Sequence, residues 1–393
     1  MRHSGHIRSR SPGSWEIRYS LGVDQRTGKR RTATTTARGS RKDAEKELRR
    51  LLRTVDEASH VDPSRTNVRQ WLSEWLDAVA DEVSPKTHER YAQIVNNFLA
   101  PELGNVVLTK LAPMHISGAY TKWQTEGRLD GRPGGLAPRT RRHIHRILRS
   151  ALARAVEQHR IPTNPADAFR HRLPKVERRE MRTLTAEQSG RLLESIKRRR
   201  LYWPCMVALS TGMRRGEILA LRWKNVDLEH GVIRVVESLE QTKKLGLRFK
   251  STKTEKAHAI TLPKFAISEL RRLRKEQAER LLLLGIRQTG ETLVIGRVDG
   301  EPLAPNVLTQ KFALAVKCLK DIPPVRFHDL RHSHATQLLL AGVHPKVCQE
   351  RLGHAAISTT LDLYSHVTAT MQEDAAQRMD EVLGDAISRA AQK

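Results

Sequence analysis

The sequence predicts a multidomain α and α+β protein with a small β-sheet-plus-helix N-terminal domain, a helical domain, and a mixed, mainly helical domain that contains a small antiparallel sheet. The chain has 393 residues, and at roughly 100 to 200 residues per domain this length suits two or three domains. Strand-like segments occur near the N-terminus and again around residues 231–262, and the stretch between them has the apolar spacing of helices. Hydrophobic residues make up 38% of the chain, enough for several small cores.

The first predicted domain, residues 1–60, combines strands with one helix. Residues 15–19 alternate like a strand, and residues 32–36 are rich in β-branched side chains. Ser40 is suited to cap a helix over residues 41–57, where apolar residues recur at helical spacing. Basic residues exceed acidic ones more strongly here than in the whole chain. The segment is therefore either a DNA-binding domain or a domain with a solvated basic face.

The second predicted domain, residues 61–175, is wholly helical. Its first helix carries apolar residues on a single face: Val68, Trp71, Leu72, Trp75, Leu76 and Val79. A second helix begins at Pro85, and another begins at Pro138 after a glycine-rich loop. Basic residues occur where these helices begin, and the N-terminus of a helix also attracts anions. These residues either contact DNA phosphates or only solubilise the helices: Lys86, Arg139, Arg141 and Arg142.

The third predicted domain, residues 176–393, begins in a charged connector. Thr185 opens a capping-box pattern in front of an amphipathic helix. Residues 231–236 and 257–262 are predicted strands, joined by a long lysine-bearing segment. From Pro305 onwards the pattern is helical. We therefore expect a small antiparallel sheet within a mainly helical domain.

The net charge indicates a nucleic-acid partner. Lys and Arg number 70 against 43 Asp and Glu, which leaves a formal charge of +27, and the pI is near 10.6. Such an excess normally requires a polyanion to neutralise it. Arg outnumbers Lys, and its planar guanidinium group binds phosphate through two parallel hydrogen bonds, although a GC-rich genome would also enrich Arg.

Several other protein classes are not supported by the sequence. The three cysteines, Cys205, Cys318 and Cys348, are widely spaced and form no C-x-x-C pattern, which argues against a disulfide framework or a zinc module. The apolar runs are far shorter than the ~20 residues that span a bilayer, and the N-terminus has no apolar signal region. We therefore expect a cytoplasmic protein without a membrane partner.

A cluster of histidine and arginine residues lies near residue 330. His328 and Arg331 are three residues apart, so both lie on one helix face and a phosphate fits between them. His332 and His334 follow closely, which raises the alternative of a zinc site. However, no Glu stands between His328 and His332 in the H-E-x-x-H manner, and no Cys is near. We therefore expect no metal.

Four segments, in order, resemble the motifs of the tyrosine recombinase (phage integrase) family. Residues 210–218 read STGMRRGEI and are similar to the family's T-G-[LM]-R-x-G-E-[IL] box. Residues 251–263 resemble its lysine-bearing β-hairpin. Residues 327–336 read FHDLRHSHAT and are similar to H-[DE]-L-R-H-[ST]-x-A-[ST]. Residues 352–366 resemble the L-G-H…T-x-x-x-Y-x-H ending. The resemblance is strong over residues 180–370.

The resemblance implies a catalytic set made of Arg214, Lys253, His328, Arg331, His354 and Tyr364. In this set the two arginines bind the scissile phosphate, the first histidine helps the tyrosine to become a nucleophile, and the second hydrogen-bonds a phosphate oxygen. The lysine protonates the leaving 5′-oxygen, and Lys250 and Lys256 are rivals of Lys253 for this role. Glu217 is expected to orient the basic groups. No cofactor is implied.

These residue types suit phosphodiester chemistry. Negative charge grows on the non-bridging oxygens as a nucleophile adds, and two guanidinium groups stabilise it. A tyrosine hydroxyl has a pKa near 10, so it needs a base or a cationic environment to attack. The leaving oxygen must gain a proton, which an ammonium group delivers. The set therefore needs no metal.

The implied function is that of a site-specific DNA recombinase, an integrase that forms a 3′-phosphotyrosyl intermediate while integrating and excising a mobile element. The helical domain resembles a core-type DNA-binding domain, and residues 1–60 resemble an arm-type one. The implied partners are double-stranded DNA at core and arm-type sites, three further copies in a homotetramer, and accessory DNA-bending or directionality factors at the nucleoid. The alternatives are a type IB topoisomerase-like enzyme and a non-catalytic architectural DNA-binding protein.

The C-terminal segment is predicted to be an acidic amphipathic packing helix. Apolar residues recur in it at helical spacing, namely Met371, Ala375, Met379, Val382, Leu383 and Ile387, with acidic residues between them. In the family, such a helix commonly docks on a neighbouring protomer. The sequence leaves open whether it packs on its own domain or on a neighbour.

Overall fold

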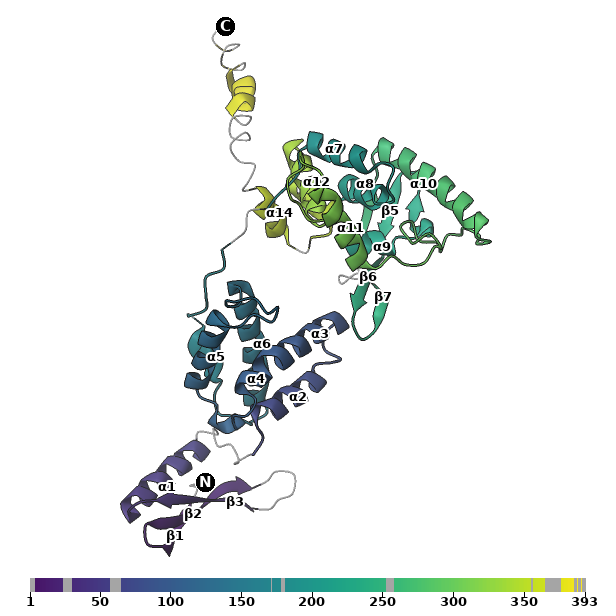
Figure 1. Cartoon of the computed structure of the whole chain (residues 1–393). Helices are drawn as coiled ribbons and strands as arrows, with labels where there is room; N and C mark the ends of the chain where they lie inside the picture. The colour runs from purple at the N-terminus through teal and green to yellow at the C-terminus, as the bar shows by residue number, and fades with distance from the viewer. Residues whose placement is uncertain are drawn as a thin grey trace. The chain divides into compact units, whose positions relative to one another are not determined.

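A computed structural model of the chain describes residues 4–23, 30–56, 65–170, 172–177, 181–251, 258–354, 356–364, 376–384, 387 and 390. The chain divides into two compact units, Met1–Glu177 and Arg178–Lys393 (Figure 1). The first unit contains a small sheet with a helix and a group of helices. The second is mainly helical with small antiparallel sheets, as the sequence predicts.

The first unit begins with a three-stranded antiparallel sheet covered on one face by a helix. The strands β1 (Gly5–Ser11), β2 (Ser14–Val23) and β3 (Arg30–Arg38) lie in sequence order and are followed by α1 (Arg41–Asp56). Ile17 and Ala44 are fully buried between sheet and helix. Ser40 caps α1, since its Oγ accepts a hydrogen bond from the backbone N–H of Asp43 at 3.3 Å. The two expected strands and the helix are confirmed, and β1 is an additional strand whose exposed polar residues hide it in the sequence.

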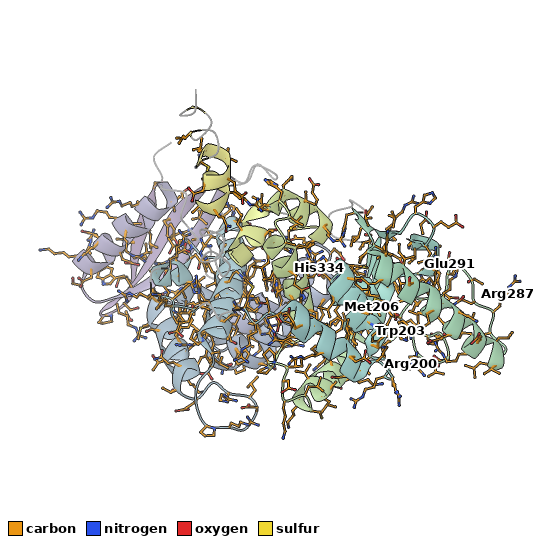
Figure 2. The ribbon with its side chains drawn as sticks, turned by 90° about the horizontal axis from the view of Figure 1, so that it is seen from above. Arg200, Trp203, Met206, Arg287, Glu291 and His334 are labelled. Atoms are coloured by element: carbon orange, nitrogen blue, oxygen red, sulfur yellow. The ribbon has the colours of Figure 1, made fainter. Side chains whose placement is uncertain are left out.

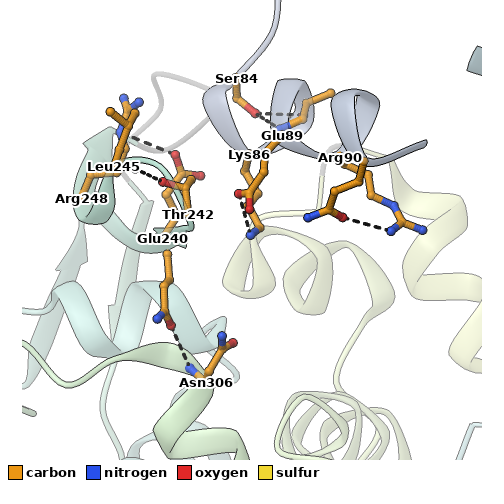
Figure 3. A network of polar contacts seen from close by, with 12 residues as sticks. Ser84, Lys86, Glu89, Arg90, Glu240, Thr242, Leu245, Arg248 and Asn306 are labelled. Carbon is orange, nitrogen blue, oxygen red and sulfur yellow. Dashed lines mark hydrogen bonds and ion pairs between the residues drawn. The ribbon is translucent and has the colours of Figure 1, made fainter. Parts of the chain in front are cut away.

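The helical part of the first unit packs around a tryptophan-rich core. Its helices are α2 (Val68–Ala78), α3 (Pro85–Ile94), α4 (Ala100–Leu103), α5 (Pro113–Thr125) and α6 (Pro138–Glu157). Trp71 is 2% exposed and donates its indole N–H to the carbonyl of Ala151, 3.0 Å away on α6. Ser84 caps α3 through the backbone N–H of Thr87 (Figure 3). The predicted apolar face of α2 and the predicted helix starts at Pro85 and Pro138 are confirmed.

In the second unit α8 is almost entirely buried, and the other elements pack around it. Its helices are α7 (Ala186–Ile196), α8 (Tyr202–Thr211), α9 (Arg215–Ala220), α10 (Lys264–Leu283), α11 (Pro305–Lys317), α12 (Asp329–Leu340), α13 (Pro345–Leu352) and α14 (Ile357–Tyr364). α8 is apolar nearly throughout, which is why it forms the centre of the unit. The capping box at Thr185 is confirmed.

The sheets of the second unit are more elaborate than predicted. β5 (Val232–Val235) pairs with β8 (His258–Thr261), beside the short β4 (Val226–Asp227), so both predicted strands are confirmed. The segment between them forms a separate hairpin of β6 (Glu237–Thr242) and β7 (Gly246–Ser251). The sequence of this hairpin lacks a clear alternation of apolar and polar residues, because a charged residue, Glu240, occupies a buried position. Glu240 is only 9% exposed and pairs with basic residues of the facing strand, among them Arg248 (Figure 3).

In the described part of the chain, no helix combines the length and the apolar character that crossing a bilayer requires. The longest helices, α6 and α10, each contain many charged residues.

Candidate active site

Four of the predicted catalytic residues stand at the ends of helices in the second unit. Arg214 is the N-cap of α9, two residues after α8 ends in the left-handed residue Gly212. His328 is the N-cap of α12, and Arg331 follows in the first turn of that helix. His354 follows Gly353, the C-cap of α13. Helix ends expose unpaired backbone groups, so these side chains lie beside carbonyls that can accept hydrogen bonds.

Arg331 is buried and joins the ends of two helices. Its side chain is 3% exposed, and it donates from Nη1 to the carbonyl of Gly212 at 2.8 Å and from Nη2 to the carbonyl of Leu352 at 2.6 Å. Burial, and then the positive charge of Arg214, lower the pKa of this guanidinium to about 10. Arg331 therefore stays charged at neutral pH and fixes the end of α8 against the end of α13.

Arg214 is held by the carbonyl of Gly353, which follows the Leu352 carbonyl that binds Arg331, and by the buried carboxylate of Glu217. Its Nη2 donates to the carbonyl of Gly353 at 2.9 Å, and its Nη1 donates to Glu217 at 2.8 Å. The other oxygen of Glu217 accepts the backbone N–H of Arg214 at 2.8 Å, which explains why this carboxylate is buried to 4% exposure. The Arg214 side chain itself is 42% exposed. One guanidinium is thus fixed in the interior and the other is fixed but accessible to an anion.

The histidines of the site are neutral at physiological pH. Burial, reinforced by neighbouring basic groups, lowers the pKa of His328 to about 4 and that of His354 to about 4. The rings of His328 and His332 lie 5.0 Å apart edge to face. The Nδ1 of His354 is 2.9 Å from the hydroxyl of Thr360 on α14, which fixes the ring. A neutral imidazole can accept a proton or donate a hydrogen bond to phosphate.

Two residues outside the predicted catalytic set, Arg351 and His334, brace this arrangement. Arg351 donates from Nη2 to the carbonyl of Ser210 at 3.0 Å, and from Nε to the Nε2 of His334 at 3.1 Å. His334, labelled in Figure 2, lies on α12. Its Nδ1 hydrogen-bonds the carbonyl of Leu209 on α8 at 2.7 Å. Burial lowers the pKa of His334 to about 4, so it serves as a neutral structural link. No sequence signal separates Arg351 from the other arginines.

The remaining predicted catalytic residues are only partly within the described part. Lys253 and its rival Lys256 lie outside the described residues. Lys250 lies on β7 and donates to Glu240 at 2.5 Å, so in this structure a carboxylate engages its ammonium group. α14 ends at Tyr364, whose side chain is outside the described part.

The described residues contain no group of three His, Cys, Asp or Glu side chains arranged to hold a metal ion.

The first unit has a basic cavity whose lining includes two of the predicted DNA-binding residues, Arg139 and Arg142. Its volume is about 1050 Å³, and it is lined by six arginines: Arg90, Arg139, Arg142, Arg146, Arg149 and Arg170. Arg141 instead donates to Gln124 at 2.7 Å, and Lys86 pairs with Glu89 at 3.1 Å. Arg139 and Arg142 are therefore brought together with further arginines that the sequence did not single out.

The sheet of the first unit presents a polar face on the side away from α1. Along β3 every second residue from Thr32 to Arg38 is exposed there, and across the strands His6 pairs with Arg18 and Arg18 pairs with Thr34. The exposed residues on this face are His6, Arg8, Arg18, Thr32, Thr34, Thr36 and Arg38. Such a flat basic and hydroxyl-rich face is suited to phosphate and base contacts.

A second cavity, of about 480 Å³, lies in the second unit beside α8 and α10, where Figure 2 labels Arg200 and Trp203. Apolar residues form most of its lining, and none of the predicted catalytic residues is among them.

Comparison with known sequences identifies two matching families. Residues 182–371 match the phage integrase family, and residues 67–124 match the N-terminal SAM-like domain of phage integrases. The ICEBs1 integrase of Bacillus subtilis (strain 168) is 26% identical over 377 residues, which cover 94% of this chain and 98% of that relative.

Solved structures share the fold. The Tn1549 transposon integrase in complex with a circular intermediate DNA has a TM-score of 0.67 at 21% identity, over 80% of this chain and 99% of that one. A lambda integrase from a tetramer bound to a Holliday junction has a TM-score of 0.56 at 20% identity, over 91% of this chain and 94% of that one.

Proposed function

The chain belongs to the tyrosine recombinase (phage integrase) family, whose members cleave and rejoin DNA strands, and from this premise we propose how its own residues perform the reaction on a mobile element. The observation that carries the proposal is the pair of guanidinium groups of Arg214 and Arg331, held by the consecutive carbonyls of Gly353 and Leu352. Two fixed, charged donors beside neutral histidines form a binding site for a single phosphodiester.

The proposed cleavage step transfers a phosphoryl group to Tyr364. Arg214 and Arg331 bind the non-bridging oxygens, and His354 donates a hydrogen bond to one of them. His328 accepts the tyrosine proton as the new oxygen–phosphorus bond forms, and the negative charge of the bound phosphate increases the basicity of this ring. The bond to the 5′-oxygen breaks, and that oxygen takes a proton from Lys253. The product is a 3′-phosphotyrosyl link, and a 5′-hydroxyl of a partner strand reverses the step.

Glu217 acts in this scheme through Arg214. It neutralises part of the positive charge and fixes the guanidinium orientation through two hydrogen bonds of 2.8 Å each. The phosphate therefore meets a donor that is already oriented, which lowers the reorganisation required in the transition state.

We propose that the helical segment, residues 61–175, binds the core site and residues 176–393 cleave it. The arginine-lined cavity of the first unit supports the binding role, because Arg139, Arg142 and their neighbours gather positive charge suited to backbone phosphates. Mutating phosphate-binding arginines should weaken binding similarly for all sequences and should reduce its salt dependence.

Residues 1–60 are proposed to bind a second, arm-type DNA site. The exposed basic and threonine-rich face of the β1–β3 sheet supports this role, since strands can read base edges in a groove while arginines contact phosphates. A protein that starts at residue 61 is expected to cleave its core site but to fail in integration. Unimpaired integration by that protein would contradict the arm-site role.

We further propose that the active species is a homotetramer on DNA in the cytoplasm, assisted by DNA-bending or directionality factors. The described part of the C-terminal segment supports an assembly role, because its apolar residues Met379, Val382 and Leu383 are exposed on this chain.

The deciding experiment is covalent capture on nicked duplexes that carry the element's end sequences. Wild-type protein is expected to form a DNA adduct at Tyr364 in the presence of EDTA, and Tyr364→Phe is expected to bind the same DNA without forming one. Strand exchange between two duplexes, measured with the same samples, separates recombination from topoisomerase-like resealing of one strand. An adduct that persists in Tyr364→Phe, or that requires a metal, refutes the proposed chemistry.

A further inference from the structure

A histidine outside the predicted catalytic set lies against the carbonyl turn that holds both arginines. His258 begins β8, where it pairs with Val235 of β5. Its imidazole ring packs on Gly353, since a Cβ added to Gly353 would lie 3.1 Å from the ring Cε1. Gly353 is left-handed, with φ of 62°, and its carbonyl accepts from Arg214. His258 is therefore in contact with the turn that positions Arg214.

A second contact ties the same strand to the same helix end. Arg351 of α13 donates from Nη1 to the carbonyl of Thr261 at 2.9 Å. The first and the last residue of β8, His258 and Thr261, thus both contact the C-terminal end of α13. This double contact fixes the imidazole beside the catalytic cluster.

The Nε2 of His258 is buried and has no hydrogen-bond partner within the described residues. Native proteins pair nearly all of their buried polar atoms, so an unpaired ring nitrogen beside a reaction site indicates a partner that arrives with the substrate. The charged groups that act on this ring are Glu217, Arg214 and Arg331. Burial is the largest influence and lowers the pKa of His258, which leaves a neutral ring with one N–H to donate.

We propose that His258 is a further ligand of the reacting phosphodiester and donates a hydrogen bond from Nε2–H to a non-bridging oxygen. The inference rests on the proposed strand cleavage at this site. The two arginines place an anion beside the ring, and a neutral donor adds selectivity for one oxygen without adding net charge. In this arrangement the bound phosphate also provides the buried nitrogen with a hydrogen-bond partner.

The first test compares single-turnover cleavage by His258→Leu and His258→Gln. Leucine retains apolar bulk beside Gly353 but no donor, so we expect the cleavage rate to fall about 100-fold, the scale of one lost oxyanion donor, while DNA affinity is unchanged. Glutamine offers an amide N–H at similar reach and is expected to restore much of the rate. The matched control is His230→Ala, because His230 is exposed and its side chain, among the described residues, pairs with the surface residue Asp227.

The second test identifies the oxygen. Scissile methylphosphonates of each configuration lack one or the other non-bridging oxygen. We expect the ratio of wild-type to His258→Leu rates to approach unity on one diastereomer and to stay large on the other. The same ratio on both diastereomers, or wild-type cleavage by His258→Leu, overturns the proposal and leaves His258 a packing residue.

Failure of the proposed function gives a different result. In that case wild-type protein forms no adduct at Tyr364 on native phosphodiester, and no ratio can be measured. Thermal unfolding of each variant separates misfolding from loss of the donor, and His258→Gln keeps the test decisive if the leucine variant does not fold.

Discussion

Replacing Glu217 by Gln tests whether the buried carboxylate makes Arg214 a catalytic group. Glutamine has the same shape but keeps only one acceptor oxygen. In the native protein both oxygens of Glu217 accept from Arg214, one from its side chain and one from its backbone N–H. The substitution therefore leaves one of these two donors facing an NH₂ group inside a site where the side chain is only 4% exposed.

The expected magnitude follows from that lost contact. A hydrogen bond to a charged group contributes about 1.5 to 3 kcal/mol. The donor that loses its partner stays buried, so water does not compensate for the lost bond. If the whole loss appears in the transition state, about 1.4 kcal/mol per factor of ten gives a cleavage rate roughly 10 to 100 times lower. DNA affinity should not fall, because the site loses a negative charge.

The assay is single-turnover cleavage of a nicked duplex, with DNA binding measured in parallel. The matched control is Glu194→Gln, which removes another ion pair of the same i, i+3 spacing, with Lys197. That pair is exposed, with 73% of the Glu194 side chain accessible, so its removal should change neither rate nor stability appreciably.

Two outcomes would refute this reasoning. If Glu217→Gln cleaves at the wild-type rate, the orientation of Arg214 does not depend on the carboxylate. If the variant loses DNA binding and cleavage together, Glu217 acts on folding rather than on the guanidinium. Urea unfolding of the variant distinguishes the second outcome.

Three further predictions concern the turn, pH and assembly. Gly353→Ala should lower the free energy of unfolding by about 1–2 kcal/mol, because Gly353 has a left-handed backbone conformation. It should also slow cleavage, because the carbonyl that holds Arg214 moves. Unfolding and cleavage assays test both effects, and an unchanged cleavage rate contradicts the second. Burial lowers the pKa of His328, His334 and His354 to about 4, whereas an unfolded histidine has about 6.5, so the unfolded chain binds more protons between these values. The free energy of unfolding should therefore be greatest above pH 6.5 and should fall as pH drops toward 4; a flat profile in urea titrations argues against neutral buried rings. Deleting residues 372–393 should leave single-site DNA binding intact but weaken pairing of two sites, and tetramers seen by sedimentation with normal recombination would mean that this helix packs on its own domain.

Much of the fold could be predicted because local patterns are strong where helices bury one face. The apolar spacing of α2, the caps at Ser40 and Thr185 and the helix starts at Pro85 and Pro138 follow directly from the sequence. The β6–β7 hairpin could not be predicted in this way. Its buried Glu240 is paired with Arg248, directly across the hairpin, and with Lys250, two residues further along β7, and such cross-strand pairing depends on register that no local pattern reveals.

For the candidate site, the sequence by itself determined which chemical groups are present and in what order, since the motifs name arginine, histidine and tyrosine side chains. The tertiary structure alone decided what holds them. The acceptors of Arg331 and Arg214 are carbonyls far away in the chain, at Gly212, Leu352 and Gly353, and every residue has such a carbonyl. His258 likewise has no distinguishing sequence context until β8 packs against the end of α13. Backbone acceptors and packing contacts carry no side-chain signature, so only the folded arrangement of helix ends reveals them.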